Sequence, residues 1–145
     1  MKNIFLILIF VSSFTYAGSD FGTWGTSCDD NGFILSLKED SSPFVVSDNQ
    51  IVVSIHSRRI NHKVIDVFFD DTLDLGIGGM GFNWGDVDKT KKIAELTYSE
   101  NNKWLMKWFG FWDVKKKTRF WVKEPDFIQT YAKNNVITLI KCEEQ

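Results

Sequence analysis

Apolar and polar positions alternate along most of this chain in short runs with a period of two residues. In FILSLK (33–38), Phe33, Leu35 and Leu37 face one way and the intervening residues face the other, which is typical of a β-strand. Turn-forming residues separate the runs at intervals of about 8–12 residues, as in β-barrels and sandwiches. The pattern therefore predicts an all-β antiparallel barrel or sandwich of about eight strands. Besides 33–38, the predicted strand segments are 21–28, 44–46, 50–57, 63–69, 80–84, 92–99, 104–112, 118–123 and 136–142.

Helical periodicity is scarce. One short helix is predicted within 124–133, where Pro125 suits the first turn. The glycine-rich LGIGGMG (75–81) imitates a dinucleotide-binding fingerprint, but no helical pattern follows it, so we expect a loop between two strands. Such a loop at a barrel mouth can carry function.

The first residues carry the pattern of a secretory signal peptide. Lys2 gives a positive start, an apolar run covers 4–11, and Thr15 and Ala17 place small residues around a cleavage site. The run is too short to cross about 30 Å of hydrocarbon. We therefore expect a signal peptide over 1–17, a single β-rich domain over 18–145, no transmembrane segment in the mature chain, and a periplasmic or secreted location.

The charge balance excludes one class of partner. Loss of Lys2 with the leader changes the net charge from −2 to −3, and the short run 115–117 is the only basic stripe. Nucleic acid is therefore not expected as a partner.

Cys28 and Cys142 are the two cysteines of the chain and lie near opposite ends of the predicted domain. In an oxidising compartment such a pair predicts a disulfide. It would enclose more than 100 residues, which the chain-entropy model values at roughly 4–5 kcal/mol. The first and last structured segments should then lie side by side.

Four of the six tryptophans fall within 103–123, KWLMKWFGFWDVKKKTRFWVK. As one strand, 104–112 would place Trp104, Trp108 and Trp112 on one face, and Arg119 and Trp121 would share a face of the return strand. Tryptophan and arginine dominate binding hot spots, and a cation beside an indole suits cation–π stacking. The alternative is a packed aromatic core. Gly110, inside the run, predicts a bulge or a close approach of backbone.

Other chemistry is weakly indicated. His56 and His62 lack metal-ligand spacing, and with Asp66 they form no strong candidate. The acids Asp66, Asp70, Asp71 and Asp74 could support acid–base work, but a solvated, charge-protected edge is the simpler interpretation. No nucleophile motif, metal site or cofactor motif is present, so no cofactor and no enzymatic activity are expected.

Phe21-Gly22-Thr23-Trp24 resembles the Gly-x-Trp opening of lipocalins and other calycins. That resemblance implies an antiparallel barrel closed at one end by Trp24, with Arg119 packed over its ring. The chain is also similar to the small secreted lysozyme inhibitors of Gram-negative bacteria, which are short, β-rich and tied by a terminal disulfide. Their Ser-Gly-x-x-Tyr binding loop is absent here, so none of their inhibitory residues is carried over.

These observations predict an exported binding protein. The leading hypothesis is a protein-binding inhibitor or immunity-type protein that acts on an envelope-active hydrolase, with the 76–81 loop and the 70–74 acids as the rim of its interface. The alternative is a carrier of a small apolar ligand in a barrel cavity. The anchors in the first case and the cavity lining in the second are the same residues: Trp104, Trp108, Trp112, Arg119 and Trp121.

Overall fold

The computed structural model describes residues 21–47 and 51–143; the predicted signal peptide over 1–17 lies outside them. The described chain is all-β with two short α-helices, which confirms the predicted fold class. Its elements are β1 (Gly22–Gly25), β2 (Ile34–Leu37), β3 (Ser42–Ser47), β4 (Ile51–Asn61), β5 (Val64–Asp74), α1 (Gly76–Gly79), the 3-10 turn η1 (Trp84–Asp86), β6 (Lys92–Ser99), β7 (Lys103–Trp108), β8 (Phe111–Asp113), β9 (Thr118–Phe120), α2 (Asp126–Tyr131) and β10 (Val136–Lys141).

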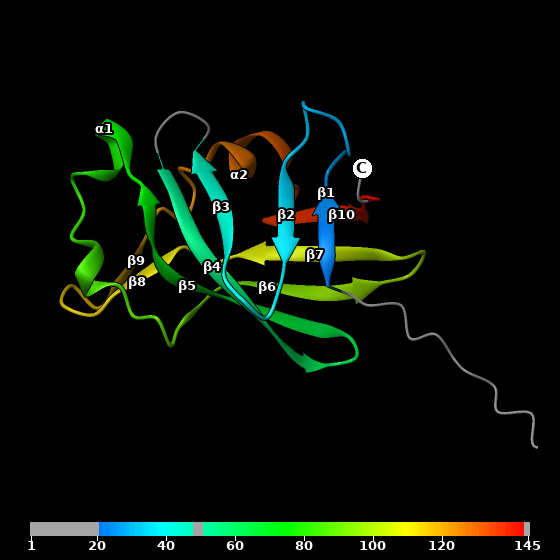
Figure 1. Cartoon of the computed structure of the whole chain (residues 1–145), viewed down its shortest axis with the longest axis horizontal. Coiled ribbons are helices and arrows are strands. Elements are labelled where there is room, and N and C mark those ends of the chain that lie inside the picture. Colours follow the sequence, from blue (N-terminus) through cyan, green and yellow to red (C-terminus); the bar gives the residue numbers. More distant parts are fainter. Residues whose placement is uncertain (1–20, 48–50, 144–145) are drawn as a thin grey trace, which may run out of the picture.

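Eight strands form one antiparallel sheet in the order β2-β1-β10-β7-β6-β5-β4-β3. The sheet curls until its two edges, β2 and β3, approach each other (Figure 1). Ser42 Oγ donates to the Ser36 carbonyl at 2.9 Å, and the Ser57 amide donates to the Lys38 carbonyl at 2.7 Å. The first bond joins the edge strands β2 and β3, and the second joins the end of β2 to β4; they form no continuous ladder, so the sheet is a nearly closed barrel.

Alternation along each strand decides which side chains enter the barrel. In β7, Trp104, Met106 and Trp108 are buried while Lys103 and Lys107 are exposed, as period-two geometry requires. The neighbouring strands contribute branched and aromatic residues to the same interior, among them Leu35, Ile55, Ile65, Leu96 and Leu139. The predicted apolar face of the tryptophan run is therefore the core-facing side of β7.

The predicted disulfide is confirmed. Cys28 and Cys142 are bonded, with their Cα atoms 5.4 Å apart. The bond follows the pairing of β1 with β10, in which Trp24 lies opposite Lys141. The first and last described strands are thus neighbours, as the cysteine positions predict.

Two loop predictions need correction. The strand predicted over 80–84 is instead a turn that leads into η1, and the glycine-rich segment contains the one-turn helix α1. The Trp84 indole Nε1 donates to the Gly79 carbonyl at 2.8 Å. That bond satisfies a buried indole and ties α1 to η1, and the Trp84 ring fixes the loop against the barrel by packing on Phe69, 5.7 Å between centroids. Glycines, by contrast, offer a strand no side chains to pack.

The C-terminal half of the chain follows the predictions more closely. The hairpin predicted over 92–112 is present as β6 and β7 but ends at Trp108, the return strand predicted over 118–123 ends at Phe120 as β9, and the helix predicted after Pro125 is α2. Asn134 and Asn135 both have positive φ and form a two-residue turn before β10, which suits the left-handed conformations of a type I′ hairpin. Helix α2 packs beside β3.

Candidate functional site

Trp104, the first predicted anchor residue, is a core side chain. It has no exposed surface, and the rings of Trp24 and Tyr98 meet it edge-on at centroid distances of 6.2 and 5.4 Å. Its Nε1 is buried and has no hydrogen-bond partner within the described part of the chain. In this conformation Trp104 presents nothing to a partner, so its contribution is to packing.

Trp108 is also buried, and its ring lies among Phe44, Phe111 and Phe127 with centroids 5.3–5.8 Å away. Its Nε1 donates to the backbone carbonyl of Trp121 at 2.8 Å. Trp108 therefore belongs to the core, although one edge reaches the surface region that holds the remaining predicted residues.

Trp112 does not share a face with Trp104 and Trp108, contrary to the prediction. Gly110 has φ +79°, and a Cβ there would lie 2.5 Å from the Phe120 carbonyl. The chain breaks at this glycine, and β8 then pairs with β9 in a separate two-stranded sheet. The alternation restarts, so Phe111 points inward and Trp112 is partly exposed. The predicted close approach at Gly110 is confirmed, and it is the reason that Trp112 changes side.

Arg119 lies directly opposite Trp112 in the β8–β9 register, with its guanidinium carbon 5.9 Å from the Trp112 ring centroid. One terminal nitrogen donates to the carbonyls of Lys92 and Gly110 at 3.0 and 2.8 Å. Burial lowers the pKa of this guanidinium, because removal from water disfavours the charged form. The expected proximity of a cation to an indole is present, and the arginine is held in a fixed orientation.

Trp121 adopts φ +53°, a left-handed conformation that is unusual for a bulky residue. Its partly buried ring packs on Phe82, 6.1 Å between centroids, and Phe82 stacks on Phe120 at 4.8 Å. Such local strain persists where surrounding contacts fix it. Trp121 thereby connects the β8–β9 hairpin to the loop that follows α1.

The contact that the calycin resemblance implies is not formed by Arg119. Lys141 occupies that place, with its Nζ 4.9 Å from the Trp24 ring centroid. Lys141 is the register partner of Trp24 across β1 and β10, whereas Arg119 is held by the carbonyls named above. A cation covers the tryptophan, but it comes from the last strand and from a different residue type.

The acids of β5 have separate partners. Asp70 contacts His56 Nδ1 at 2.5 Å, and Asp66 pairs with Lys92 at 3.1 Å. The Asp71 and Asp74 carboxylates accept the backbone N–H groups of nearby residues. Among the residues that the structure describes, no three His, Cys, Asp or Glu side chains gather as metal ligands. The four acids thus act in ion pairs and turns instead of facing each other across one site.

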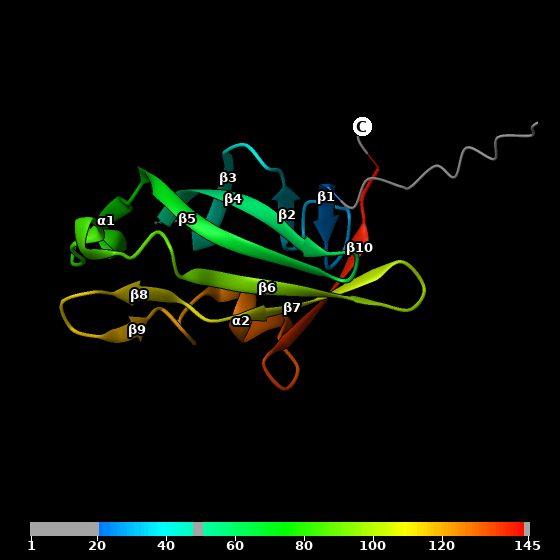
Figure 2. The same ribbon diagram turned by 90° about the horizontal axis from the view of Figure 1, so that it is seen from below.

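The most exposed large apolar side chains gather at one end of the molecule, around α1. Leu73, Ile77 and Met80 are 59%, 86% and 69% exposed; we call these three residues the apex. The segment that carries them is held in place, because the Gly79 amide donates to the Leu75 carbonyl at 2.8 Å and Trp84 holds the Gly79 carbonyl. The β8–β9 hairpin lies at the same end (Figures 1 and 2). Isolated apolar residues in a glycine-rich loop were the sequence signal for this feature.

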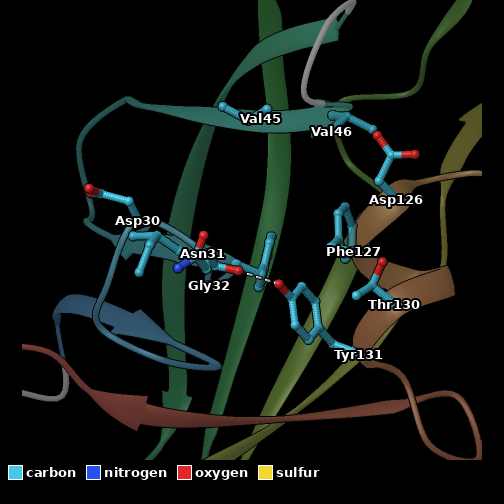
Figure 3. A pocket seen from close by; sticks show the side chains of 11 residues that line it. Asp30, Asn31, Gly32, Val45, Val46, Asp126, Phe127, Thr130 and Tyr131 are labelled. Atoms are coloured by element: carbon cyan, nitrogen blue, oxygen red, sulfur yellow. Dashed lines mark hydrogen bonds between the residues drawn. The ribbon is translucent and has the colours of Figure 1, made fainter.

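A pocket of about 450 Å³ opens where β2 and β3 fail to pair, and α2 forms its other wall. Figure 3 shows Phe127 and Tyr131 of α2 facing the 30–32 turn, where the Tyr131 hydroxyl donates to the Asn31 carbonyl at 2.5 Å. Ile34 and Val45 are exposed apolar side chains in the lining. Asp30 and Asp126 give the lining an acidic character without a basic residue. We call this the seam pocket.

Comparisons with known protein families, with curated proteins and with solved structures each found no match to the chain. Within residues 21–47 and 51–143, no helix has both the length and the apolar character that crossing a membrane requires.

Proposed function

We propose that this is an exported binding protein that docks onto another protein through its apex, and that the partner is an envelope-active hydrolase which it inhibits or against which it confers immunity. The observation that carries the proposal is the position of Ile77, 86% exposed on a segment that Trp84 anchors to the barrel through its ring contact with Phe69. Exposed apolar residues that gather at one place are typical of interaction sites.

Preorganisation favours docking by this apex. A loop that must become ordered on binding loses conformational entropy, which reduces affinity. Here the bonds of Gly79 to Leu75 and Trp84 already define the loop. The partly exposed Trp112 and the Trp121–Phe82 contact lie on connected segments, so they are candidates for the flank of the same interface. Asp71 and Asp74 of β5 would provide an acidic rim that favours a basic partner.

Export is supported by two features. The signal-peptide pattern predicts secretion, and the Cys28–Cys142 disulfide is of a type that persists in oxidising compartments such as the periplasm or the cell exterior. Both are consistent with a partner that acts on the cell envelope.

Inhibition assays test the proposal. Oxidised protein covering residues 18–145 would be titrated against a panel of peptidoglycan hydrolases, lipases and proteases of the envelope. We expect stoichiometric inhibition of at least one enzyme, and a loss of at least tenfold in inhibitory potency with Ile77→Asp. Ile60→Asp is the matched control, because Ile60 is 49% exposed at the end of the β4–β5 hairpin far from α1 (Figure 1). No inhibition across the panel, or equal losses with the two variants, would contradict the proposal.

The second candidate, a carrier of a small apolar ligand, is favoured by the seam pocket instead of by the barrel interior. The inward ring of Trp108 already contacts the rings of Phe111 and Phe127. The pocket's volume of about 450 Å³ lies within the usual range of ligand sites, about 300–1,000 Å³. Lipid that co-purifies with wild-type protein and is lost with Val45→Arg would support this candidate.

A further inference from the structure

A groove of about 290 Å³ lies beside Arg119 and is separate from both the apex and the seam pocket. It runs between the end of β7, the segment after β9, and α2. Its lining contains three basic residues and no acid: Lys107, Trp108, Phe109, Arg119, Val122, Lys123, Ile128 and Asn135. The chain has a net charge of −2, whereas this lining carries an excess of positive charge.

The basic residues of the groove are not neutralised. Lys107, Arg119 and Lys123 form no ion pair with a carboxylate of the described residues, although Lys92 and Lys115 elsewhere do. Glu95 is the register partner of Lys107, but Lys92 holds its carboxylate. The Glu124 carboxylate accepts the backbone N–H of Lys123 at 2.9 Å and not its ammonium group.

Arg119 is the most constrained of these cations. One of its terminal nitrogens is fixed by the Lys92 and Gly110 carbonyls, and neither carbonyl carries a formal negative charge. A partly buried guanidinium without a counter-charge is costly to desolvate. A planar guanidinium held in this way is well suited to a carboxylate, which it can bind through two parallel hydrogen bonds.

Apart from Asn135, the rest of the groove lining is apolar. Phe109 lies with Arg119 and Lys107 at 5.4 and 5.6 Å from its ring centroid, and Val122 and Ile128 line the groove beside it. A ligand that fits would present an acidic group to the cations and an apolar body to the rings and branched side chains. The volume of about 290 Å³ lies just below the usual range for ligand sites, about 300–1,000 Å³, which favours a single short chain.

We propose that this groove binds a small amphiphilic carboxylate, with its acidic head at Arg119, Lys107 and Lys123 and its apolar chain over Phe109, Val122 and Ile128. The inference does not depend on the protein-docking proposal, because no apex residue lines the groove. A basic ligand would be repelled, and a neutral apolar ligand would leave the three cations without a counter-charge.

The test uses decanoate and its neutral counterpart decanol as probes, titrated into oxidised protein and followed by calorimetry. We expect saturable binding of decanoate, with decanol at least tenfold weaker. Lys107→Gln combined with Lys123→Gln should weaken decanoate binding at least tenfold. The matched control is Lys103→Gln with Lys116→Gln, which makes the same charge change at exposed lysines that do not line the groove and should bind as wild type does.

A second measurement locates the site in wild-type protein. The indole N–H resonance of Trp108 should shift with decanoate, because this side chain lines the groove. Absence of decanoate binding, equal binding of decanol, an unshifted Trp108 resonance, or wild-type affinity in the Lys107/Lys123 variant would each overturn the proposal. Because Ile77→Asp should retain decanoate binding, failure at the groove and failure at the apex remain distinguishable.

Discussion

The indole Nε1 of Trp108 donates a 2.8 Å hydrogen bond to the carbonyl of Trp121. The bond joins the barrel interior to a residue with φ +53°, a conformation that needs support from its surroundings. It also borders the groove, since Val122 and Lys123 follow directly. Core packing and the candidate groove are thus physically linked through one side chain.

Trp108→Phe is expected to destabilise the protein by more than Trp104→Phe. Both changes remove the same atoms from the core, but only the first leaves a carbonyl without its donor, which costs about 1–3 kcal/mol. Trp104 Nε1 has no such partner among the described residues. Urea unfolding of the two variants measures the difference, and equal losses would show that the Trp121 bond adds nothing.

Gly110→Ala should destabilise by about 2 kcal/mol or more. A left-handed backbone costs a residue with a side chain roughly 1–2 kcal/mol, and the added Cβ would also lie 2.5 Å from the Phe120 carbonyl. Gly81→Ala serves as control, because a Cβ at Gly81 meets no atom within 4 Å. Thermal unfolding should show a clear drop for Gly110→Ala alone; a similar melting temperature for both variants would refute the geometric argument.

Lys117→Gly is expected to stabilise the β8–β9 turn by about 0.5–1 kcal/mol. Lys117 has φ +52°, and glycine removes the left-handed penalty of roughly 1–2 kcal/mol while adding a smaller entropic cost. The neighbouring exposed Lys116 lies outside that region, so Lys116→Gly should destabilise. The denaturant midpoints of the two variants measure these changes in stability. Midpoint shifts of the same sign in both variants would contradict the prediction.

Reduction of Cys28–Cys142 should lower the free energy of unfolding by about 4–5 kcal/mol, since the bond joins residues separated by 114 positions. Urea titrations with and without reductant measure the loss. The Cys28→Ser/Cys142→Ser double variant should be insensitive to reductant and should resemble the reduced wild type. A reductant effect that persists in the double variant would point to a different cause.

The contribution of Lys92 to the stability of the fold should depend on pH in the alkaline range. Its hydrogen bond to Glu95 chiefly raises the pKa of this ammonium above its ordinary value of 10.5, Asp66 adds to the effect, and burial opposes it. A raised pKa of a basic group stabilises the fold below the unfolded-state pKa, and this stabilisation is lost as pH rises through the folded-state pKa. The stability difference between wild type and Lys92→Met should therefore be constant at neutral pH and should shrink above about pH 10.5. A difference that does not change across that range would contradict the assignment.

The sequence was most informative where local pattern and final structure depend on the same geometry. Alternation in FILSLK and in KWLMKW correctly predicts which side chains share a face, since strand periodicity fixes the direction of each side chain; that the tryptophan face of KWLMKW enters the core is seen only in the structure. The cysteine positions likewise predict that β1 and β10 are neighbours. These features required no knowledge of long-range contacts.

The candidate site was less predictable because it depends on one backbone conformation and on tertiary pairing. The strand breaks at Gly110 and the alternation restarts in β8, so Trp112 cannot be placed from alternation alone. In the sequence, Lys107 is only a polar residue within an otherwise apolar face. Its ammonium group is available to a ligand because Glu95 forms its ion pair with Lys92 instead. Ile77 falls within the 76–81 loop that the sequence predicts as the rim of the interface, and its exposure of 86% agrees with an apolar residue flanked by glycines, which has few neighbours that could cover it.

The position of the disulfide also has a mechanical consequence. Because Cys28 and Cys142 are joined near the two ends of the described chain, a pulling force applied at the termini passes through the sulfur–sulfur bond. The strands between these cysteines carry none of the load, and the covalent loop limits how far the chain can extend. Strands β2 to β10 would therefore stay within one covalent loop for as long as the bond is oxidised, whereas β1, which precedes Cys28, would bear the force in its pairing with β2 and β10.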